Sequence, residues 1–489
     1  MSKCFINVKD EVWCSISGLS PTHNEILWNE LGVHVDGYFF MPAYKLGRWD
    51  GKIRFYEKTG KTYFRLLDRI IPYLEKWEYD IELNDNRKYW QSPEVTGNIT
   101  SVDSLGIAVS GENLDIMGDV EIRPGKKFEL RPYQLQCVKL CAEHGSGFIV
   151  AGTGAGKTSI TAAISYFYGL KGYKIITIVP SGDLVTQTKE WYETLQLDVG
   201  EYSGDSKDIN HTHVVATWQA IQYNPSIMQE FQVLIWDESH GIKASVAQKI
   251  INESGKHIPF RFGVTGTFPK PESDKLSLTS SIGPILKEIP AAWLIEHGYL
   301  AKVQIQPVEL NESYVDEDFP DYASEKAFLS RSTARMEMIA NIIISQCATH
   351  GNTLVLVNSI PFGEKLASLI KDAVFLYGES PKDLRREHYE MFEKNDDIIV
   401  IASSGIASTG ISIDRVFCLA LVDAGKSFIK AIQSIGRGLR LGHDKEAVHV
   451  VDIHSKQKWA RKHFKEREKY YKEASYPILK KETIKIKSE

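Results

Sequence analysis

From Glu129 onward, short apolar runs alternate with longer stretches in which apolar residues recur at helical spacing. Runs this short and this apolar predict strands buried on both faces, and helical stretches between them predict βαβ units with parallel pairing. The predicted strands are 147–151, 174–179, 213–217, 232–236, 353–357, 397–402 and 416–422. The alternation is interrupted between Leu300 and Ala323, so we predict two α/β lobes in tandem, at residues 129–300 and 301–455.

The first part of the chain has a different pattern of apolar and polar residues. Short β-like runs at 37–41 and 52–56 stand beside a helical stretch at 66–77, which predicts a small α+β domain over residues 1–90. Pro72 falls inside that helix, where it can kink or restart it. Two segments flank the lobes: a predicted linker at 91–128, rich in Ser, Gly, Asn, Asp and Pro, and a basic helical tail at 456–489.

Composition is that of an ordinary globular protein. The 489 residues suffice for about three domains, and 43% hydrophobic with 25% charged residues is a typical balance. No apolar run approaches the roughly 18 residues of a membrane span, and the first residues lack the pattern of a signal peptide. Six scattered cysteines give no disulfide framework, and Cys137 with Cys141 has the spacing of a buried helix stripe. We expect a reduced, cytoplasmic protein.

Charge changes the picture only when it is resolved along the chain. The net charge of −5 argues by itself against a surface coated for nucleic acid. Residues 41–70, however, carry eight basic and three acidic residues with interleaved aromatics, and residues 455–489 carry twelve basic and five acidic. Such mixtures contact phosphates and bases, although a small domain also needs aromatics for its core. We predict contacts with duplex DNA from the tail and from Arg48, Trp49, Lys52 and Arg54.

The strongest local signal is Ala151-Gly-Thr-Gly-Ala-Gly-Lys157-Thr158, between a predicted strand and a predicted helix. Glycines let successive backbone N–H groups face a phosphate, which the helix N-terminus also attracts. In this pattern the lysine reaches the β- and γ-phosphates and the Thr158 hydroxyl holds Mg²⁺. The strict pattern has Gly where Ala151 stands. The predicted nucleotide-binding residues are Gly152, Thr153, Gly154, Ala155, Gly156, Lys157 and Thr158.

An acidic pair, Asp237-Glu238, follows another predicted strand. A carboxylate at a strand end beside a phosphate loop can hold Mg²⁺, so Thr158 and Asp237 are the predicted metal residues. The adjacent Glu238 can orient and deprotonate the attacking water. Alone, such a pair is usually a solvated loop. Because it lies in the same lobe as Lys157, we expect it to act with the phosphate loop.

Gln433, Arg437 and Arg440 are spaced four and three apart, which places them on one face of a helix. Arginines on a second lobe can neutralise the charge that builds on the γ-phosphoryl group, so hydrolysis would depend on closure of the lobes around ATP. A solvated arginine pair on a surface helix is the alternative. These three residues complete the predicted catalytic set with Lys157 and the acidic pair.

The segments described so far are part of an ordered set of motifs. Leu130-Arg-Pro-Tyr-Gln134 precedes the phosphate loop, and Asp237-Glu-Ser-His240 and Thr265-Gly-Thr267 follow it. The remaining motifs are Val179–Gln187, Ala216–Gln219, Leu356–Ser359, Ser408–Ser412 and Gln433–Arg440. The set resembles that of the superfamily-two helicases and translocases, over about two thirds of the chain. The resemblance implies two RecA-like lobes that use ATP and Mg²⁺.

The resemblance also assigns roles to individual residues. Arg131, Gln134 and Gly410 would contact the nucleotide. His240, Thr265 and Thr267 would couple hydrolysis to lobe movement. The polar residues that would contact the sugar–phosphate backbone are Thr186, Gln187, Thr217, Gln219, Asn358, Ser359, Ser408 and Thr409. Helix caps and turns use the same residue types, so each of these has a structural alternative.

The N-terminal part of the sequence resembles one particular type of helicase within the superfamily. Pro42 and Gly47-Arg-Trp-Asp-Gly51-Lys-Ile-Arg54 are similar to the accessory domain of UvsW-type phage helicases. That resemblance implies fork regression, Holliday-junction branch migration and D-loop or R-loop unwinding in phage replication, recombination or repair, in the host cytoplasm. The implied partners are branched and duplex DNA, RNA–DNA hybrids, and phage recombination or replication proteins. Ser412 departs from the pattern, because many relatives have an acidic residue there.

Three other functions stay open. The same motor motifs occur in RNA helicases and in duplex translocases that do not unwind, and stimulation of the ATPase by DNA or by RNA tells DNA from RNA enzymes. A P-loop nucleotide-dependent regulator is the alternative from another class, although a simple switch does not need a second lobe with its own arginines. A nuclease is disfavoured, because the sequence has no surplus carboxylate cluster and no HExxH spacing.

Arg437→Ala should lower kcat for ATP hydrolysis by about 10³-fold or more and leave nucleotide affinity nearly unchanged. The reason is that an arginine finger acts on charge that develops only in the transition state. Steady-state ATPase assays and fluorescent-nucleotide binding measure the two quantities. A loss of affinity as large as the loss of kcat would contradict the assignment.

Overall fold

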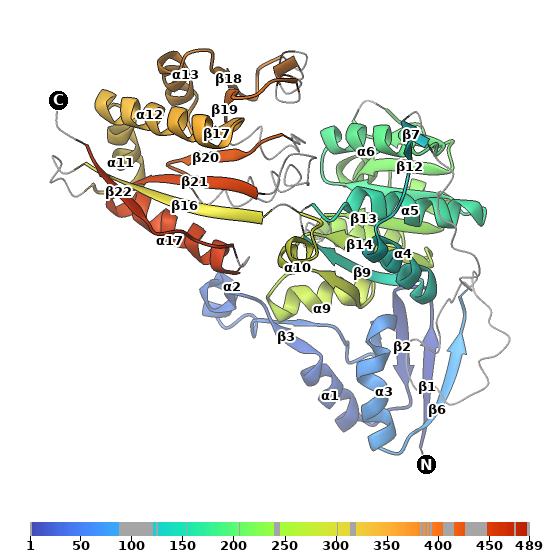
Figure 1. Ribbon diagram of the computed structural model, residues 1–489. Coiled ribbons are helices and arrows are strands. Elements are labelled where there is room, and N and C mark those ends of the chain that lie inside the picture. The colour runs from blue at the N-terminus through green and yellow to red at the C-terminus, as the bar shows by residue number, and fades with distance from the viewer. Residues whose placement is uncertain are drawn as a thin grey trace. The chain divides into compact units, whose positions relative to one another are not determined.

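The computed structural model describes residues 2–87, 121–123, 126–152, 154–204, 206–238, 245–300, 302–312, 319–381, 384, 387–388, 391, 394–403, 415–425, 447–473 and 476–486. These residues form two compact units. Met1–Gly152 and Gly156–Glu288 belong to the first, and Ile289–Glu489 belongs to the second. Each unit has a seven-stranded sheet, which confirms the predicted fold of two parallel-sheet lobes preceded by a small α+β domain (Figure 1).

The N-terminal domain is a four-stranded sheet with two helices on its core. The strand order is β5-β2-β1-β6, with β1 at Lys3–Val8, β2 at Trp13–Ser17, β5 at Lys61–Tyr63 and β6 at Asp80–Asp85. Every second side chain of β1 is buried, as in a sheet with one covered face. Helices α1 (Pro21–Glu30) and α3 (Leu67–Lys76) contribute to the same core, and Pro72 lies inside α3.

The prediction of a strand at residues 37–41 is wrong. Gly37 has a φ of +68°, which a strand does not use, and the chain continues as a 3₁₀ turn, η1 (Tyr38–Phe40), and a short helix, α2 (Pro42–Lys45). The run predicted at 52–56 does contain a strand, β4 (Lys52–Arg54). It pairs antiparallel with β3 (Gly32–His34). A second small pair, β7 (Glu121–Arg123) with β8 (Lys126–Lys127), lies within the predicted linker.

The first lobe has the strand order β11-β12-β10-β13-β14-β9-β15. Its strands are β9 (Ser146–Ala151), β10 (Ile175–Val179), β11 (Val199–Tyr202), β12 (His213–Thr217), β13 (Val233–Asp237), β14 (Phe260–Thr265) and β15 (Ile285–Ile289). All residues of β10, β12, β13 and β14 are buried, the pattern of a sheet covered on both faces. Its helices and turns are α4 (Pro132–His144), α5 (Lys157–Leu170), α6 (Gly182–Thr194), α7 (Trp218–Tyr223), η4 (Pro225–Glu230), α8 (Ser245–Lys249), η6 (Ile250–Ser254) and α9 (Glu272–Ser281).

The N-terminal domain is docked on the first lobe within the same unit. Leu276 of α9 is buried in the core of the N-terminal domain. The Trp13 indole N–H donates to the carbonyl of Asn252 at 3.0 Å, and the Glu11 N–H donates to the carbonyl of Lys256 at 2.9 Å. Arg69 forms an ion pair with Glu272 at 3.7 Å. These contacts join the small domain to the lobe that carries the phosphate loop.

The second lobe has the strand order β18-β19-β17-β20-β21-β16-β22. Its strands are β16 (Lys302–Asn311), β17 (Thr353–Val357), β18 (Val374–Leu376), β19 (Ile399–Ser403), β20 (Cys418–Val422), β21 (Ala447–Ser455) and β22 (Glu482–Lys485). Its helices include α10 (Ala291–Glu296), α11 (Tyr322–Leu329), α12 (Thr333–His350), α13 (Ile360–Leu369) and α17 (Lys458–Glu473). The segment where the apolar rhythm is interrupted thus contains a ten-residue strand, β16, and the residues of the basic tail supply α17 and β22.

The tail also supplies a buried ion pair. The Arg467 guanidinium, fully buried on α17, donates to both carboxylate oxygens of Asp452 at 2.8 and 2.6 Å, and the Tyr471 hydroxyl donates to the same carboxylate at 2.7 Å. Burial alone raises the pKa of Asp452, but the charge and hydrogen bonds of Arg467 outweigh burial and lower it. Arg467 therefore presents no charge to DNA, contrary to its count in the basic tail.

Two further expectations concern membranes and thiols. Among the described residues, the helices include none that is long and apolar enough to cross a membrane. All six cysteines are buried free thiols. Burial raises the pKa of Cys137 to about 12, as expected for a core residue.

Arg467→Met should lower the free energy of unfolding by about 3–5 kcal/mol, because it leaves the Asp452 carboxylate buried without its partner. The control Asp452→Leu/Arg467→Met should recover much of that loss. Because the Asp452 pKa is lowered in the folded state, the stabilisation is present above the unfolded carboxyl pKa of about 3.9 and is lost as pH falls through the folded value. Urea unfolding of the variants between pH 7 and pH 3 measures both effects. Equal stability of wild type and Arg467→Met would contradict the prediction.

Candidate functional site

The phosphate loop joins β9 to α5, as the sequence predicts. Gly154 and Gly156 have φ values of +83° and +75°, and Gly156 is the N-cap of α5. A Cβ on Gly156 would also lie 2.4 Å from the Gln134 side-chain nitrogen. Glycine is therefore required at this position both for its backbone conformation and for space. The loop leads into the N-terminus of α5, whose first backbone N–H groups are the usual donors to a phosphate.

Lys157, the first residue of α5, has a side chain only 9% exposed. Its ammonium lies 3.4 Å from the Glu238 carboxylate. A Cβ on Gly266 would be 3.4 Å from the same ammonium, so Gly266 leaves room for the lysine. The predicted phosphate-binding lysine and the predicted base thus form an ion pair.

Three neighbouring strand ends meet at this site. β13 ends at Asp237 and β14 ends at Thr265; Asp237 pairs with Val264, and Thr265 pairs with Val150 of β9. Because parallel strands end at the same edge of a sheet, the phosphate loop, the acidic pair and the Thr265 turn are neighbours. The structure brings together residues that lie more than a hundred positions apart in the sequence.

The acidic pair has a constrained backbone. Asp237 is mostly buried, and its carboxylate accepts a hydrogen bond from the N–H of Glu238 at 2.9 Å. Glu238 has a φ of +49°, which is uncommon for a residue with a side chain and is often found at functional sites. The hydroxyl of Thr265 donates to the carbonyl of Thr267 at 3.0 Å and fixes the turn that follows β14.

Gln134 connects the start of α4 to the phosphate loop. Its side-chain oxygen accepts from the N–H of Arg131 at 2.9 Å in a capping box, and its side-chain nitrogen faces Gly156. Arg131 donates to the Tyr133 hydroxyl at 3.2 Å. The segment with Arg131 and Gln134, which was predicted to contact the nucleotide, therefore touches the phosphate loop.

Eight of the predicted site residues lie outside the described residues, and their roles stay predictions. They are Thr153, His240, Ser408, Thr409, Gly410, Gln433, Arg437 and Arg440. Ser412 lies there too.

In the first lobe, the predicted nucleic-acid residues follow β10 and β12. Thr217 caps α7, its hydroxyl accepting from the N–H of Ala220 at 3.3 Å, and its role in DNA contact stays a prediction. The side-chain nitrogen of Gln219 donates to the carbonyl of Pro180 at 3.3 Å and ties the two strand ends together. Its buried oxygen has no hydrogen-bond partner within the described part of the chain. Thr186 donates to the carbonyl of Gly182 at 3.4 Å on α6, which also carries Gln187.

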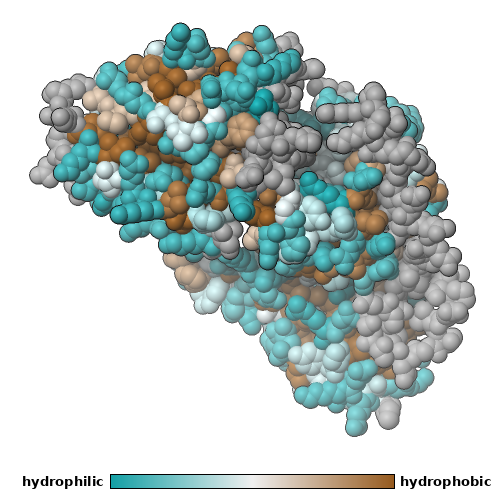
Figure 2. Space-filling model, in the orientation of Figure 1, coloured by the Kyte–Doolittle hydropathy of each residue, from teal (hydrophilic) through white to brown (hydrophobic). Residues whose placement is uncertain are grey.

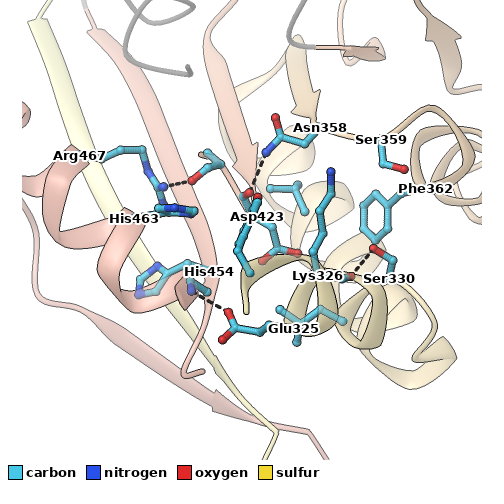
Figure 3. A pocket seen from close by; sticks show the side chains of 15 residues that line it. Glu325, Lys326, Ser330, Asn358, Ser359, Phe362, Asp423, His454, His463 and Arg467 are labelled. Carbon is cyan, nitrogen blue, oxygen red and sulfur yellow. Dashed lines mark hydrogen bonds between the residues drawn. The ribbon is translucent and has the colours of Figure 1, made fainter. Parts of the chain in front are cut away.

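In the second lobe, Asn358 and Ser359 follow β17 and line a cavity of about 30 Å³. Figure 3 shows the Asn358 amide turned toward Asp423, whose carbonyl it contacts at 2.9 Å. The Asp423 carboxylate pairs with buried Arg335 at 2.6 Å, and Arg335 also donates to Glu312 at 2.9 Å. The position of Asn358 therefore depends on a buried ionic network.

The four predicted DNA residues of the N-terminal domain differ in their surroundings. Arg54 packs over the Trp28 ring at 3.9 Å and pairs with Asp50. Its guanidinium is therefore bound to partners within the domain. The Trp49 indole donates to the carbonyl of Lys52 at 2.9 Å, and Arg48 is exposed. Sequence reasoning missed the neighbouring Phe39 and Phe40, whose side chains are exposed where a strand was predicted.

Three family profiles match the chain. Residues 23–84 match "DNA helicase UvsW, N-terminal", residues 127–270 match "Type III restriction enzyme, res subunit", and residues 334–442 match "Helicase conserved C-terminal domain". The second and third matches cover the two lobes, and the first covers most of the N-terminal domain.

Two curated relatives and one solved structure are similar. The ATP-dependent DNA helicase uvsW of Enterobacteria phage T4 is 27% identical over 86% of this chain and 84% of its own length. The DNA 3'-5' translocase XPB2 of Sulfurisphaera tokodaii is 24% identical over 80% of this chain and 94% of its own. The ATP-dependent Type ISP restriction-modification enzyme LlaBIII bound to DNA has a TM-score of 0.53 at 16% identity, over 68% of this chain and 28% of its own, which supports the two-lobe fold.

The ordered motifs, the paired lobes and these relatives define the class: the chain is an ATP-dependent DNA helicase of superfamily two. Within that class it is similar to the UvsW type, because both the profile of the UvsW N-terminal domain and the phage T4 relative match it.

Glu238→Gln should bind ATP with near-normal affinity and hydrolyse it about 10²–10⁴-fold more slowly, because the amide cannot accept the proton of the attacking water. Filter binding of labelled ATP and single-turnover hydrolysis separate the two effects. Glu253→Gln, at an exposed carboxylate of the same lobe, is the matched control. Near-normal turnover by Glu238→Gln would refute its role as the base.

Proposed function

We propose that this helicase remodels branched DNA: it would regress forks, migrate Holliday junctions and unwind D-loops and R-loops during phage replication, recombination or repair. The observation that carries the proposal is the docking of a UvsW-type N-terminal domain on the ATP-binding lobe. Because the two form one unit, a grip on duplex DNA by the small domain would move with the lobe that binds ATP. We place this activity in the cytoplasm of an infected cell, with phage recombination or replication proteins as partners.

The ATP site supports a definite division of labour. The N–H groups of the Gly152–Gly156 loop and Lys157 would bind the phosphates. Thr158 and Asp237 have the hydroxyl and carboxylate oxygens that Mg²⁺ prefers, at the start of α5 and the end of β13. The ion there would neutralise phosphate charge. Glu238 would orient the attacking water and take its proton.

The ion pair between Lys157 and Glu238 suggests how ATP binding could activate Glu238 as the base. In the ion pair, the lysine occupies the Glu238 carboxylate that would have to contact the attacking water. When the phosphates draw the ammonium away, Glu238 becomes free to accept a proton. Binding of the substrate would therefore activate the base in the same step.

The nucleic-acid motifs would hold one strand by its backbone. Thr186, Gln187, Thr217 and Gln219 in the first lobe and Asn358 with Ser359 in the second offer hydroxyls and amides at strand ends and in the first turns of the helices that follow. Such groups bind sugar and phosphate without reading sequence, as a motor on arbitrary DNA requires.

A duplex translocase that does not separate strands is the second candidate. It is favoured by the similarity to XPB2 of Sulfurisphaera tokodaii, which is described as a DNA translocase. The test below tells this activity from remodelling of branched DNA.

Wild-type protein should convert a fork, a four-way junction and an R-loop in an ATP-dependent manner, and should leave a linear blunt duplex intact. Gel assays with labelled strands measure the conversion, and Lys157→Ala is the control without ATP turnover. ATPase activity stimulated by duplex DNA without conversion would indicate the translocase. Stimulation by RNA alone would indicate an RNA helicase.

A further inference from the structure

A projecting segment of the N-terminal domain carries exposed apolar side chains. Residues 35–51 connect β3 to β4 and include η1 and α2. The label α2 marks this segment in Figure 1. We call residues Tyr38–Leu46 the apolar tip. Its most exposed large side chains are Phe40 at 70%, Leu46 at 63% and Phe39 at 51%.

The apolar tip has a defined backbone. The N–H of Phe40 donates to the carbonyl of Gly37 at 2.9 Å, and the N–H of Leu46 donates to the carbonyl of Pro42 at 3.0 Å. The base of the segment is closed by the N–H of Val35 and the carbonyl of Gly51 at 2.9 Å. The tip is therefore held in one shape although neither η1 nor α2 has a buried residue.

Tyr38 anchors the tip to its base. A Cβ on Gly51 would lie 2.3 Å from the Tyr38 ring, so the ring packs directly on the backbone of that glycine. Tyr44 meets the edge of the same ring, with centroids 4.8 Å apart. Tyr38 thus supports the tip from within, while Phe39 and Phe40, whose rings lie 4.3 Å apart, are exposed.

Exposed apolar residues are common when they are scattered. Figure 2 shows hydrophobic and hydrophilic residues interspersed over the visible face of the molecule. The tip differs because Phe39, Phe40, Met41, Tyr44 and Leu46 are exposed within eight consecutive positions. An exposed apolar cluster of this kind is typical of an interaction site.

The charges around the tip indicate which class of partner it fits. Lys45 and Arg48 are exposed, and Lys52 is half-buried. The segment also has two acidic residues: Asp50, which is paired with Arg54, and Asp36, which is exposed, so cations are in excess around the tip. Aromatic rings flanked by cations are the combination that binds unstacked bases and the phosphates beside them.

We propose that the apolar tip is a wedge that stacks on the bases exposed at a DNA branch point, with Lys45 and Arg48 holding the adjacent phosphates. At a branch the last base pair has lost one stacking neighbour, and Phe39 or Phe40 replaces it. This rests on the proposed function and adds to it the element that would recognise the branch. The chemistry that it reads is the π-face of any base, so it requires no particular sequence.

The test uses the full-length chain and a fork with 2-aminopurine at the branch-point base pair. Phe39→Ala/Phe40→Ala should weaken binding to the fork about tenfold relative to single-stranded DNA, because base–aromatic stacking supplies that much affinity. It should also abolish the change in 2-aminopurine fluorescence that the wild type produces at the branch. Phe40→Trp should retain both properties, and Leu170→Ala, at an exposed leucine of α5, is the matched control.

Each outcome decides the proposal. Unchanged fork affinity and unchanged fluorescence in the double variant would overturn it. An equal loss of basal ATPase activity without DNA would also overturn it, because the tip would then contact another part of this chain. If the wild type remodels no branched substrate but the double variant still loses the branch-point signal, the proposed function fails and the wedge stands. If the wild type remodels branches and the double variant does so equally, the wedge alone fails.

Discussion

Parallel pairing in the first lobe is the constraint on which the chemistry of this helicase depends. The pairing of Asp237 with Val264 and of Thr265 with Val150 places three strand ends side by side, and the phosphate loop, the acidic pair and the Thr265 turn follow from that arrangement. Side-chain packing between β14 and β9 helps to fix the register of these two strands. A Cβ on Gly263 would lie 2.2 Å from the Phe148 ring on β9, so any larger residue there would move β14 against the strand that carries the phosphate loop.

The N-terminal domain depends on the same lobe. Its core includes Leu276, and its Trp13 indole is hydrogen-bonded to the Asn252 backbone. A domain fixed in this way cannot reorient freely, so whatever DNA it holds has a set position relative to the first lobe. This rigidity matters for the proposed role of the apolar tip. A tip on a flexible tether could not hold a fixed position against the bases at a branch point.

The sequence predicted best what burial dictates. The strands at His213–Thr217 and Thr353–Val357 are found at the predicted bounds, since all their residues are buried and apolar runs report burial directly. β16 was missed because its first residues alternate between buried and exposed positions. The run at 37–41 was predicted as a strand because composition cannot tell whether an apolar residue belongs to a strand or to an exposed turn. The loop, the lysine and the acidic pair were found from local pattern, whereas their ion pair needed the fold.

Counting basic residues overstates what this chain offers to DNA. Arg261, Arg335 and Arg467 are fully buried, and their guanidinium groups are held by backbone carbonyls or carboxylates inside the lobes. Buried acidic residues, among them Glu312 and Asp452, offset those charges, so the exterior remains acidic overall, in line with the net charge of −5. Such a surface gives little long-range attraction for DNA. Affinity must then come from short-range contacts at particular places. Stacking on bases depends little on a long-range field, which is the physical reason to expect exposed aromatic rings beside the surface cations Lys45 and Arg48.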